Sequence, residues 1–290
     1  MVRKTFGKRF GKRALSPVIS TVILTGAIVV LLGVALVFAN GLLWSKIAEG
    51  DFNSAKQFMQ TVGITIDDVA WTVGRTETIR YSSRYGDITI ENLTLSYTIS
   101  VDFYNATSGQ DENRQFSRET GVLLFNVQTS KYSVTDGYHE LIFPSEDDTL
   151  TLKGTSAPVA RVFAVEKHDT GSFIRVVVAP SIRFFNSTIA MSDSSTYYVK
   201  LYLPVLALGS APRRTQAVTL TGDSFEAKTI SGVTKINVTV SFPQENPPKN
   251  IDASFFNFPS LSEEITIPGG YDDSVFEFYV GEVTVDLGLK

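Results

Sequence analysis

The chain has 290 residues, 43% of them hydrophobic, a length that accommodates one large domain or two smaller ones with a sizeable core. It contains no cysteine, which excludes disulfides, thiolate metal sites, cysteine nucleophiles and a lipid-bearing cysteine. The formal net charge is -4, but six of the 26 basic residues precede Ala14, which leaves 20 basic against 30 acidic residues after it. This acidic remainder argues against a nucleic-acid ligand, because phosphate binding needs clustered Lys and Arg.

The basic leader is followed by a long uncharged segment. No residue from Ala14 to Ser45 is charged. A helix of that length would reach about 48 Å, more than the roughly 30 Å hydrocarbon core of a bilayer. We therefore expect this segment to enter a membrane, with the positive charges before it on the cytoplasmic side and the remainder of the chain outside.

Three kinds of N-terminal segment fit this pattern. A secretory signal peptide would be cut at Val37-Phe38-Ala39, although the apolar run before that site exceeds the roughly 7 to 15 residues typical of signal peptides. A permanent signal anchor fits the length and the orientation equally well. In the third interpretation the cut falls on the cytoplasmic side, so residues 1–14 are removed and the apolar helix stays on the mature protein.

The third interpretation rests on the stretch KRALSPVI, which ends at Ile19. It resembles the class III signal peptides of archaeal type IV pilins, in which the prepilin peptidase, a membrane aspartic protease, cuts after a small residue preceded by charged ones. The resemblance implies a processing site at Lys12, Arg13, Ala14 and Leu15, with the scissile bond between the last two. The Ser-Pro-Val-Ile run is similar to that of archaeal adhesion-type pilins. Bacterial type IV pilins usually have Glu where this chain has Ile19.

The resemblance implies a structural subunit of a cell-surface filament that polymerises through its N-terminal helix and serves adhesion or surface attachment. Its implied partners are copies of itself, the prepilin peptidase, an assembly ATPase, a membrane platform protein and membrane lipid before assembly. No cofactor and no nucleic acid are implied. A membrane-anchored binding protein that does not polymerise is the alternative function, and a secreted hydrolase is a third.

The pair Ser16-Pro17 predicts the helix start, because Ser is a favoured N-cap and Pro is best tolerated at the first helical position. Beyond Trp44 charges return, but apolar residues continue at three- and four-residue steps as far as Val73. The segment 15–74 is therefore expected to be one long helix, apolar all round in its first half and amphipathic in its second. Glycine weakens a helix, so kinks are expected at Gly41, Gly50 and Gly63 if anywhere.

Two glycines in the apolar half define a candidate packing seam. Gly26 and Gly33 are seven residues apart and lie near one face of a helix, where they would let a neighbouring backbone approach closely. Glycine is also common in helices that contact only lipid, so simple tolerance of lipid explains the pair equally well.

Residues 75–290 read as a β-rich extracellular domain, because short runs rich in Thr, Val and Tyr alternate with turns. We expect an α+β protein whose helical stalk precedes a mainly antiparallel, sandwich-like head, with one or two sheets. The predicted strands are Thr76 to Tyr81, Ile88 to Tyr104, Val122 to Val127, Glu140 to Phe143, Thr149 to Lys153, Pro158 to Val165, Phe173 to Val178, Tyr197 to Leu203, Ala217 to Leu220, Lys235 to Phe242, Glu264 to Ile267 and Val275 to Val285. The stretches Ser108 to Arg118 and Gln244 to Asn250 are the predicted exposed loops.

Four sequons in this outward region are candidate N-glycosylation sites, at Asn92, Asn105, Asn186 and Asn237. Several lie within or at the ends of predicted strands, so a glycan fits only where the Asn side chain points to solvent.

Residues that could carry enzyme chemistry are sparse. The two histidines, His139 and His168, are too few for an imidazole metal site and are expected at the surface. The acidic pairs Asp67-Asp68, Asp147-Asp148 and Asp272-Asp273 lack the alternating spacing of a calcium loop and are expected in solvated turns. The sequence therefore predicts that the chain is not an enzyme and binds no metal.

Overall fold

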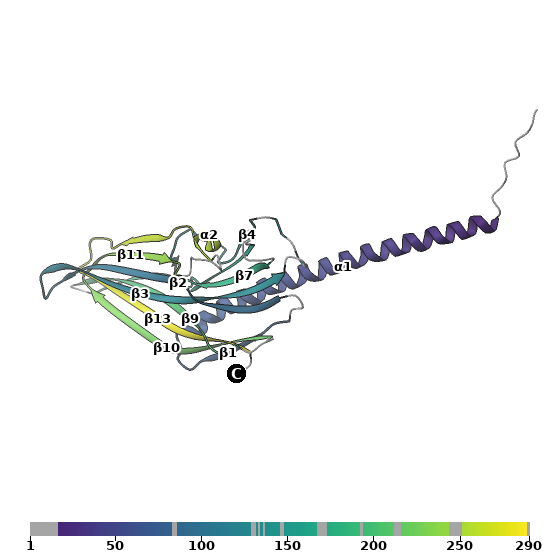
Figure 1. The fold of residues 1–290 in the computed structure, drawn as a ribbon. Coiled ribbons are helices and arrows are strands. Elements are labelled where there is room, and N and C mark those ends of the chain that lie inside the picture. The colour runs from purple at the N-terminus through teal and green to yellow at the C-terminus, as the bar shows by residue number, and fades with distance from the viewer. Residues whose placement is uncertain are drawn as a thin grey trace, which may run out of the picture. The chain divides into compact units, whose positions relative to one another are not determined.

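The computed structural model describes residues 17–82, 86–128, 132, 134–135, 137–145, 148–166, 173–191, 194–211, 216–243 and 251–288. The chain divides into two compact units, Met1–Ile47 and Ala48–Lys290. A long apolar helix is followed by a β-rich domain with two sheets, which confirms the predicted α+β class (Figure 1).

Helix α1 spans Pro17–Ala70 and so begins at the predicted first helical position. It ends at Ala70, four residues before the predicted end at residue 74. The chain leaves the helix through Gly74, whose φ of +82° lies in the left-handed region that favours glycine. The Gly74 N–H then donates to the carbonyl oxygen of Gly222 at 2.7 Å, which ties the end of the helix to a strand.

The described strands of the second unit form two sheets. Sheet A has the order β1-β10-β13-β9-β8-β5, and sheet B has the order β12-β11-β2-β3-β7-β6-β4. In sheet A the strands are β1 (Thr76–Arg80), β10 (Ala217–Ser231), β13 (Asp273–Leu287), β9 (Ser195–Leu208), β8 (Arg183–Ala190) and β5 (Leu152–Lys153); in sheet B they are β12 (Ser262–Thr266), β11 (Val233–Ser241), β2 (Gly86–Asn105), β3 (Gln110–Gln128), β7 (Phe173–Pro180), β6 (Ala160–Glu166) and β4 (His139–Phe143).

Most neighbouring strands are antiparallel, as predicted, but β13 pairs with β9 in parallel and β5 pairs with β8 in parallel. A short helix α2, Ala253–Phe256, follows β11. Its N-terminus is capped by Asp252, whose side chain accepts a hydrogen bond from the Phe255 N–H at 3.0 Å.

Two hydrophobic cores result from the alternation of side chains along the strands. The first, here called the sheet core, lies between sheets A and B, and α2 contributes Phe255 and Phe256 to it. The second, the helix core, joins the part of α1 in the second unit to residues of both sheets. Strand β13 serves both cores because successive residues point to opposite faces: Phe276, Phe278 and Val280 enter the sheet core, whereas Val283, Val285 and Leu287 enter the helix core.

The predicted loop at Ser108 to Arg118 is wrong. Strand β3 already begins at Gln110 and pairs with β2 in a register that runs from Gln110 opposite Asn105 to Arg118 opposite Tyr97. Most side chains of this stretch are exposed. Backbone pairing with β2 therefore forms the strand without the burial that a sequence pattern detects. Strand β8 was not predicted, and the other predicted loop, Gln244 to Asn250, lies outside the described residues.

Candidate functional site: the apolar segment of helix α1

The first half of α1 exposes its apolar side chains all round. Every described side chain from Ile19 to Lys46 is exposed, and the helix is long and apolar enough to cross a membrane. The large hydrophobic residues among them are Ile19, Val22, Ile23, Leu24, Ile28, Val29, Val30, Leu31, Leu32, Val34, Leu36, Val37, Phe38, Leu42, Leu43 and Trp44. We call residues 19–45 the apolar segment. At about 25 cal/mol per Å² of apolar surface, a segment of this composition is far more stable in lipid or against protein than in water.

The helical form of the segment suits both environments. An α-helix satisfies its own backbone hydrogen bonds, which is the requirement for crossing a bilayer. The interior of a helical bundle makes the same demand on a buried backbone. The geometry of the apolar segment therefore fits a membrane and a packed bundle of helices equally.

Gly26 and Gly33 both lie in the apolar segment. A Cβ atom added at either position would meet nothing within 4 Å, so nothing within the chain requires glycine there. Asn40 lies seven residues beyond Gly33 and hence near the same face of the helix. Asn40 was not among the predicted packing residues. A polar amide in an apolar run, at the same seven-residue spacing as Gly26 and Gly33, is the signal in the sequence that could have indicated it.

The second half of α1 buries one narrow stripe. Its buried residues are Ala48, Phe52, Ala55, Phe58, Met59, Val62, Gly63, Ile66, Val69 and Ala70, and most of them recur at alternating four- and three-residue steps. All of them except Ala48 and Gly63 belong to the helix core, where they pack with residues of β2, β3, β6, β7, β10 and β13. The predicted amphipathic character of this half is therefore accounted for by contact with the sheets.

The backbone at the end of α1 lies very close to the backbone of two strands of sheet A. A Cβ added to Gly281 of β13 would lie 2.2 Å from the carbonyl oxygen of Ala70. A Cβ added to Gly222 of β10 would lie 2.6 Å from the carbonyl oxygens of Val69 and Thr72. Glycine at these two positions lets the helix end rest directly on sheet A.

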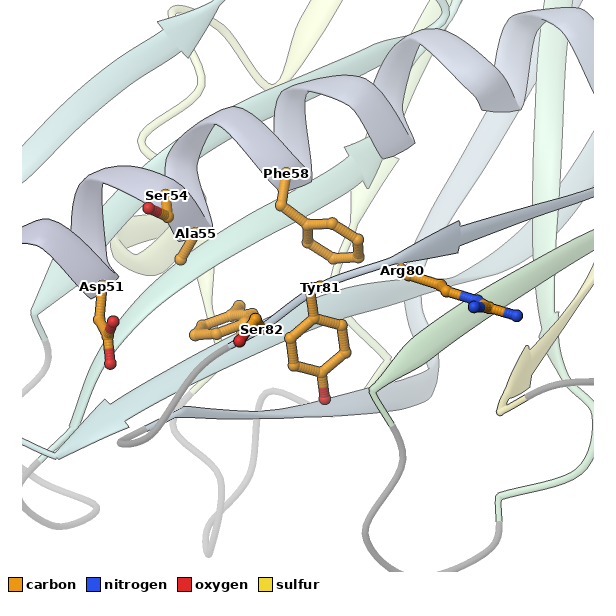
Figure 2. A pocket seen from close by; sticks show the side chains of 8 residues that line it. Asp51, Ser54, Ala55, Phe58, Arg80, Tyr81 and Ser82 are labelled. Carbon is orange, nitrogen blue, oxygen red and sulfur yellow. The ribbon is translucent and has the colours of Figure 1, made fainter.

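A pocket of about 290 Å³ lies beside the packed half of α1 (Figure 2). Phe58 of the helix and Tyr81, which follows β1, face each other across it with ring centroids 5.0 Å apart. Asp51 and Arg80 supply the charged groups of the lining. The pocket is small, and its aromatic walls already contact each other, so it offers no evident ligand site.

A charged network fixes the side of α1 that carries Lys56. The ammonium of Lys56 donates to the Glu140 carboxylate and to the Tyr138 hydroxyl, the latter at 3.2 Å, and lies 4.8 Å from the centre of the Phe52 ring. Burial alone would raise the pKa of Glu140, but the hydrogen bonds from Lys56 and Tyr138 hold that pKa below its ordinary value. Burial and the neighbouring carboxylate raise the pKa of Tyr138. Glu140 is therefore ionised and Tyr138 neutral at neutral pH.

The predicted processing site, Lys12, Arg13, Ala14 and Leu15, lies outside the described residues, and so does Ser16. Pro17 is the first residue of α1.

The four sequons occupy different settings. Asn105 begins the turn between β2 and β3, where its side chain donates to Glu112 at 2.7 Å and accepts from the Thr107 N–H at 2.9 Å. Asn92 lies at an irregularity of β2 and accepts from the Leu208 N–H at 3.0 Å. Asn186, exposed on β8, donates to the Tyr197 hydroxyl at 2.6 Å, and Asn237 is half-buried on β11.

The structure corrects the expectation for His139. This side chain is half-buried rather than at the surface, and its ring stacks on Phe163 with centroids 5.1 Å apart. Burial lowers the pKa of His139, so the ring is neutral at neutral pH. His168 lies outside the described residues.

The acidic pairs were expected in solvated turns, but Asp67 lies in helix α1, and both Asp67 and Asp272 bond to other parts of the fold. Asp67 accepts from the Trp71 indole at 2.7 Å and pairs with Arg183 at 2.9 Å. Asp272 accepts from the backbone and the hydroxyl of Ser195, at 2.6 and 3.0 Å. Asp147 lies outside the described residues. In the described part of the chain, no three His, Cys, Asp or Glu side chains gather as a metal site would require.

Comparison with known proteins yields no relative: no family model, no curated protein and no solved structure matches the chain.

Proposed function

We propose that this chain is a structural subunit of an archaeal type IV pilus-like surface filament, which polymerises through helix α1 and serves adhesion or surface attachment. The observation that carries the proposal is the apolar segment, an exposed helix that continues into a helix packed on a β domain. One continuous helix thus combines a half that is apolar on every side with a half that packs on the two sheets.

The physical logic is an exchange of apolar surroundings. Before assembly the apolar segment lies in lipid, and in the filament it packs among identical helices, so apolar burial is retained throughout. Because that exchange is nearly neutral in hydrophobic free energy, assembly needs an energy source. The resemblance of the leader to class III signal peptides supplies the candidates: the prepilin peptidase, an assembly ATPase and a membrane platform protein.

Processing and assembly can be tested with a matched pair of substitutions in the host cell. In A14L, a large residue replaces the small residue before the proposed scissile bond, whereas A39L makes the same change at the competing signal-peptide site. We expect A14L to accumulate with its leader and form no filaments, and A39L to be processed and assembled as the unchanged chain is. The measurements are immunoblotting of membranes and electron microscopy of cell surfaces.

A second function is a membrane-anchored extracellular binding protein that does not polymerise. The length and composition of α1 favour it as well, because the helix alone suffices to hold the β domain at the membrane. Electron microscopy separates the two functions. Filaments that disappear on deletion of the gene and return with the unchanged chain support the filament subunit, and a deletion that leaves the cell surface unaltered supports the anchored protein.

A further inference from the structure

Strand β8 forms an open edge of sheet A along most of its length. It pairs with β9 from Arg183 to Ala190, whereas on its other side β5 reaches only Arg183 and Phe184. In the described part of the chain, no strand pairs with residues 185–190 on that side. Unpaired backbone N–H and C=O groups at the edge of a sheet can pair with a strand of another chain, so this edge favours association.

The open edge of β8 lacks the protection that the other edges have. The run FFNSTIAM, residues 184–191, contains no charged residue and no proline, and Ile189 and Met191 are 47% and 72% exposed. The other strands at the ends of the two sheets each carry a charged residue, namely Glu77 in β1, Glu140 in β4, Lys153 in β5 and Glu264 in β12. Charged residues and prolines prevent pairing between edges, so the open edge of β8 needs another form of protection.

A sequon lies on this open edge. It consists of Asn186, Ser187 and Thr188, and the side chains of Asn186 and Thr188 are both exposed. The Asn186 amide donates a hydrogen bond to the Tyr197 hydroxyl at 2.6 Å. A primary amide carries two N–H groups, so one can be replaced by a bond to a sugar while the other keeps the contact with Tyr197.

The four sequons differ in how much of the motif the fold leaves accessible. Only the Asn186 sequon exposes both its Asn and its Thr. In the Asn92 sequon, Thr94 is 1% exposed, and its hydroxyl donates to the Glu91 carbonyl at 2.8 Å. A transferase that recognises the motif must contact its Ser or Thr as well as its Asn, so the Asn92 motif is closed in the folded domain.

The fold holds the other two sequons through their Asn side chains. Asn237 is half-buried in β11, between β2 and β12, and accepts from the Ser262 hydroxyl at 3.1 Å. Asn105 is half-buried in the turn that joins β2 to β3, where it donates to Glu112 and accepts from the Thr107 N–H. A glycan at either position would compete with these neighbours for space, so neither position favours one.

These features assign a modification to one Asn. We propose that Asn186 carries an N-linked glycan, which covers the open edge of β8. The donor is a lipid-linked glycosyl phosphate, used by an oligosaccharyltransferase on the outer side of the membrane. The Asn186 Nδ2 forms a bond to the anomeric carbon while the bond from that carbon to the phosphate oxygen breaks. The lipid phosphate leaves with the electron pair, Nδ2 loses one proton to a base of the transferase, and nothing is oxidised or reduced.

The position of Asn186 suits it to block the edge. On the open side, the Phe184 carbonyl accepts from the Gly154 N–H at 3.0 Å. Alternate residues of a strand direct their backbone groups to the same side, so Asn186 and Thr188 present their N–H and C=O groups at the open edge. An incoming strand would have to pair directly beside the glycan. Glycans are bulky and hydrated, so pairing there would be obstructed.

Peptide mass spectrometry of the full chain from its native host tests the attachment. Trypsin releases residues 184–200 as a peptide that contains Asn186 and no other sequon, and residues 236–249 as one that contains only Asn237. We expect a glycan mass increment on the 184–200 peptide in most molecules and none on the 236–249 peptide. An unmodified 184–200 peptide, or an increment on the 236–249 peptide alone, would overturn the proposal.

This modification rests on only one part of the proposed function, the location of the β domain outside the cell, which the anchored binding protein shares. The two proposals can therefore fail separately. A mature protein that begins at Leu15 but has an unmodified Asn186 would overturn the glycan and not the filament subunit. A glycan on Asn186 of a protein that retains Met1 would support the glycan and contradict the filament subunit.

Three variants test whether the glycan protects the edge. T188A destroys the sequon but keeps the Asn186 amide, so we expect it to lose the mass increment and to sediment faster than the unchanged chain in detergent micelles, because its bare edges pair. The matched control is Y197F, which removes the hydrogen bond to Asn186 and should keep both the glycan and the original sedimentation. Adding I189K to T188A puts a charge on the bare edge and should restore the original sedimentation without a glycan.

Two results with these variants would overturn the proposed role. The first is a T188A protein that has lost the mass increment and yet sediments as the unchanged chain does. The second is a double variant, T188A with I189K, that still sediments faster, because association would then lie elsewhere on the molecule. Circular dichroism and thermal unfolding of each variant show whether the fold is intact before sedimentation is compared.

Discussion

The two halves of helix α1 are built from similar apolar residues, but they differ in where these residues lie around the helix. In the apolar segment, exposed hydrophobic side chains occur on every side. In the second half, the buried ones follow a single stripe at four- and three-residue steps from Ala48 to Val69. The stripe matches what a helix resting on sheets requires, and the full coverage matches a helix surrounded by lipid or by other helices.

This difference shows that one helix can combine two roles with separate physical demands. The second half stabilises the β domain and tolerates little change at its buried positions. The described side chains of the apolar segment are exposed, so they are available to an external partner. The comparison can be tested by making the same substitution in each half.

The largest contrast is expected for isoleucine to alanine. Ile66 is fully buried in the helix core, whereas Ile23 is 62% exposed in the apolar segment. I66A should lower the free energy of unfolding of the β domain by about 2–5 kcal/mol, because it leaves a cavity in a packed core. I23A should leave that free energy unchanged to within about 0.5 kcal/mol. Denaturant unfolding in micelles measures both, and equal losses would contradict the division of α1 into two roles.

A second contrast uses glycine to alanine. G281A places a methyl group against the Ala70 carbonyl and should cost about 1–3 kcal/mol in the stability of the domain, since the clash is with backbone rather than with a mobile side chain. G33A adds its methyl group in open space and should raise helix stability by up to about 1 kcal/mol. Thermal unfolding checks the first variant and helix content by circular dichroism the second. A neutral G281A would contradict the close approach of α1 to β13.

Larger side chains in the apolar segment should impair filament assembly without affecting the folded domain. G26L and G33L are expected to leave membrane insertion and domain stability intact but to reduce filament number about tenfold, if these glycines line contacts between helices. A matched bulky control is A27L, one residue away on a different face. Fractionation and electron microscopy give the two measurements. Normal filaments from both glycine variants would refute the packing seam.

The smallest effect is expected from the charged network on the packed half. The folded pKa of Glu140 is depressed below 4.5, so its contribution to stability is present above that pH and is lost as pH falls through the folded pKa. The Glu140 side chain is 42% exposed, and solvent screening limits the effect of E140Q to about 0.5 kcal/mol near pH 7. Melting temperatures of the two proteins should converge as the pH falls below the folded pKa of Glu140. A difference that persists there would show that E140Q acts through packing rather than charge.

The extent to which the sequence predicts this fold differs between its elements. Helix α1 could be predicted because Ser16-Pro17 marks its start and its apolar spacing runs without interruption. Strands such as β11, with Ile236, Val238 and Val240 buried, could be predicted because alternation reports a half-buried sheet. The first half of β3 could not, since residues such as Gln110 and Glu112 are polar and the strand depends on pairing with β2.

Contacts between segments far apart in the chain could not be predicted from local sequence patterns. The parallel pairing of β9 with β13 gives no sequence signal that differs from antiparallel pairing. The approach of Ala70 to Gly281 depends on residues far apart in the chain. Spacing along the sequence reports only neighbours on one element, so such sites need the folded arrangement.

The N-terminal residue of the mature protein tests the central proposal most directly. If α1 is retained as a polymerisation element, protein purified from cells begins at Leu15, with the basic leader removed and Pro17 near the new terminus. Edman degradation or N-terminal mass spectrometry reads this residue directly. A mature protein that begins at Asn40 would have lost the apolar segment, and one that retains Met1 would be an unprocessed anchor, so either result would contradict the proposed filament subunit.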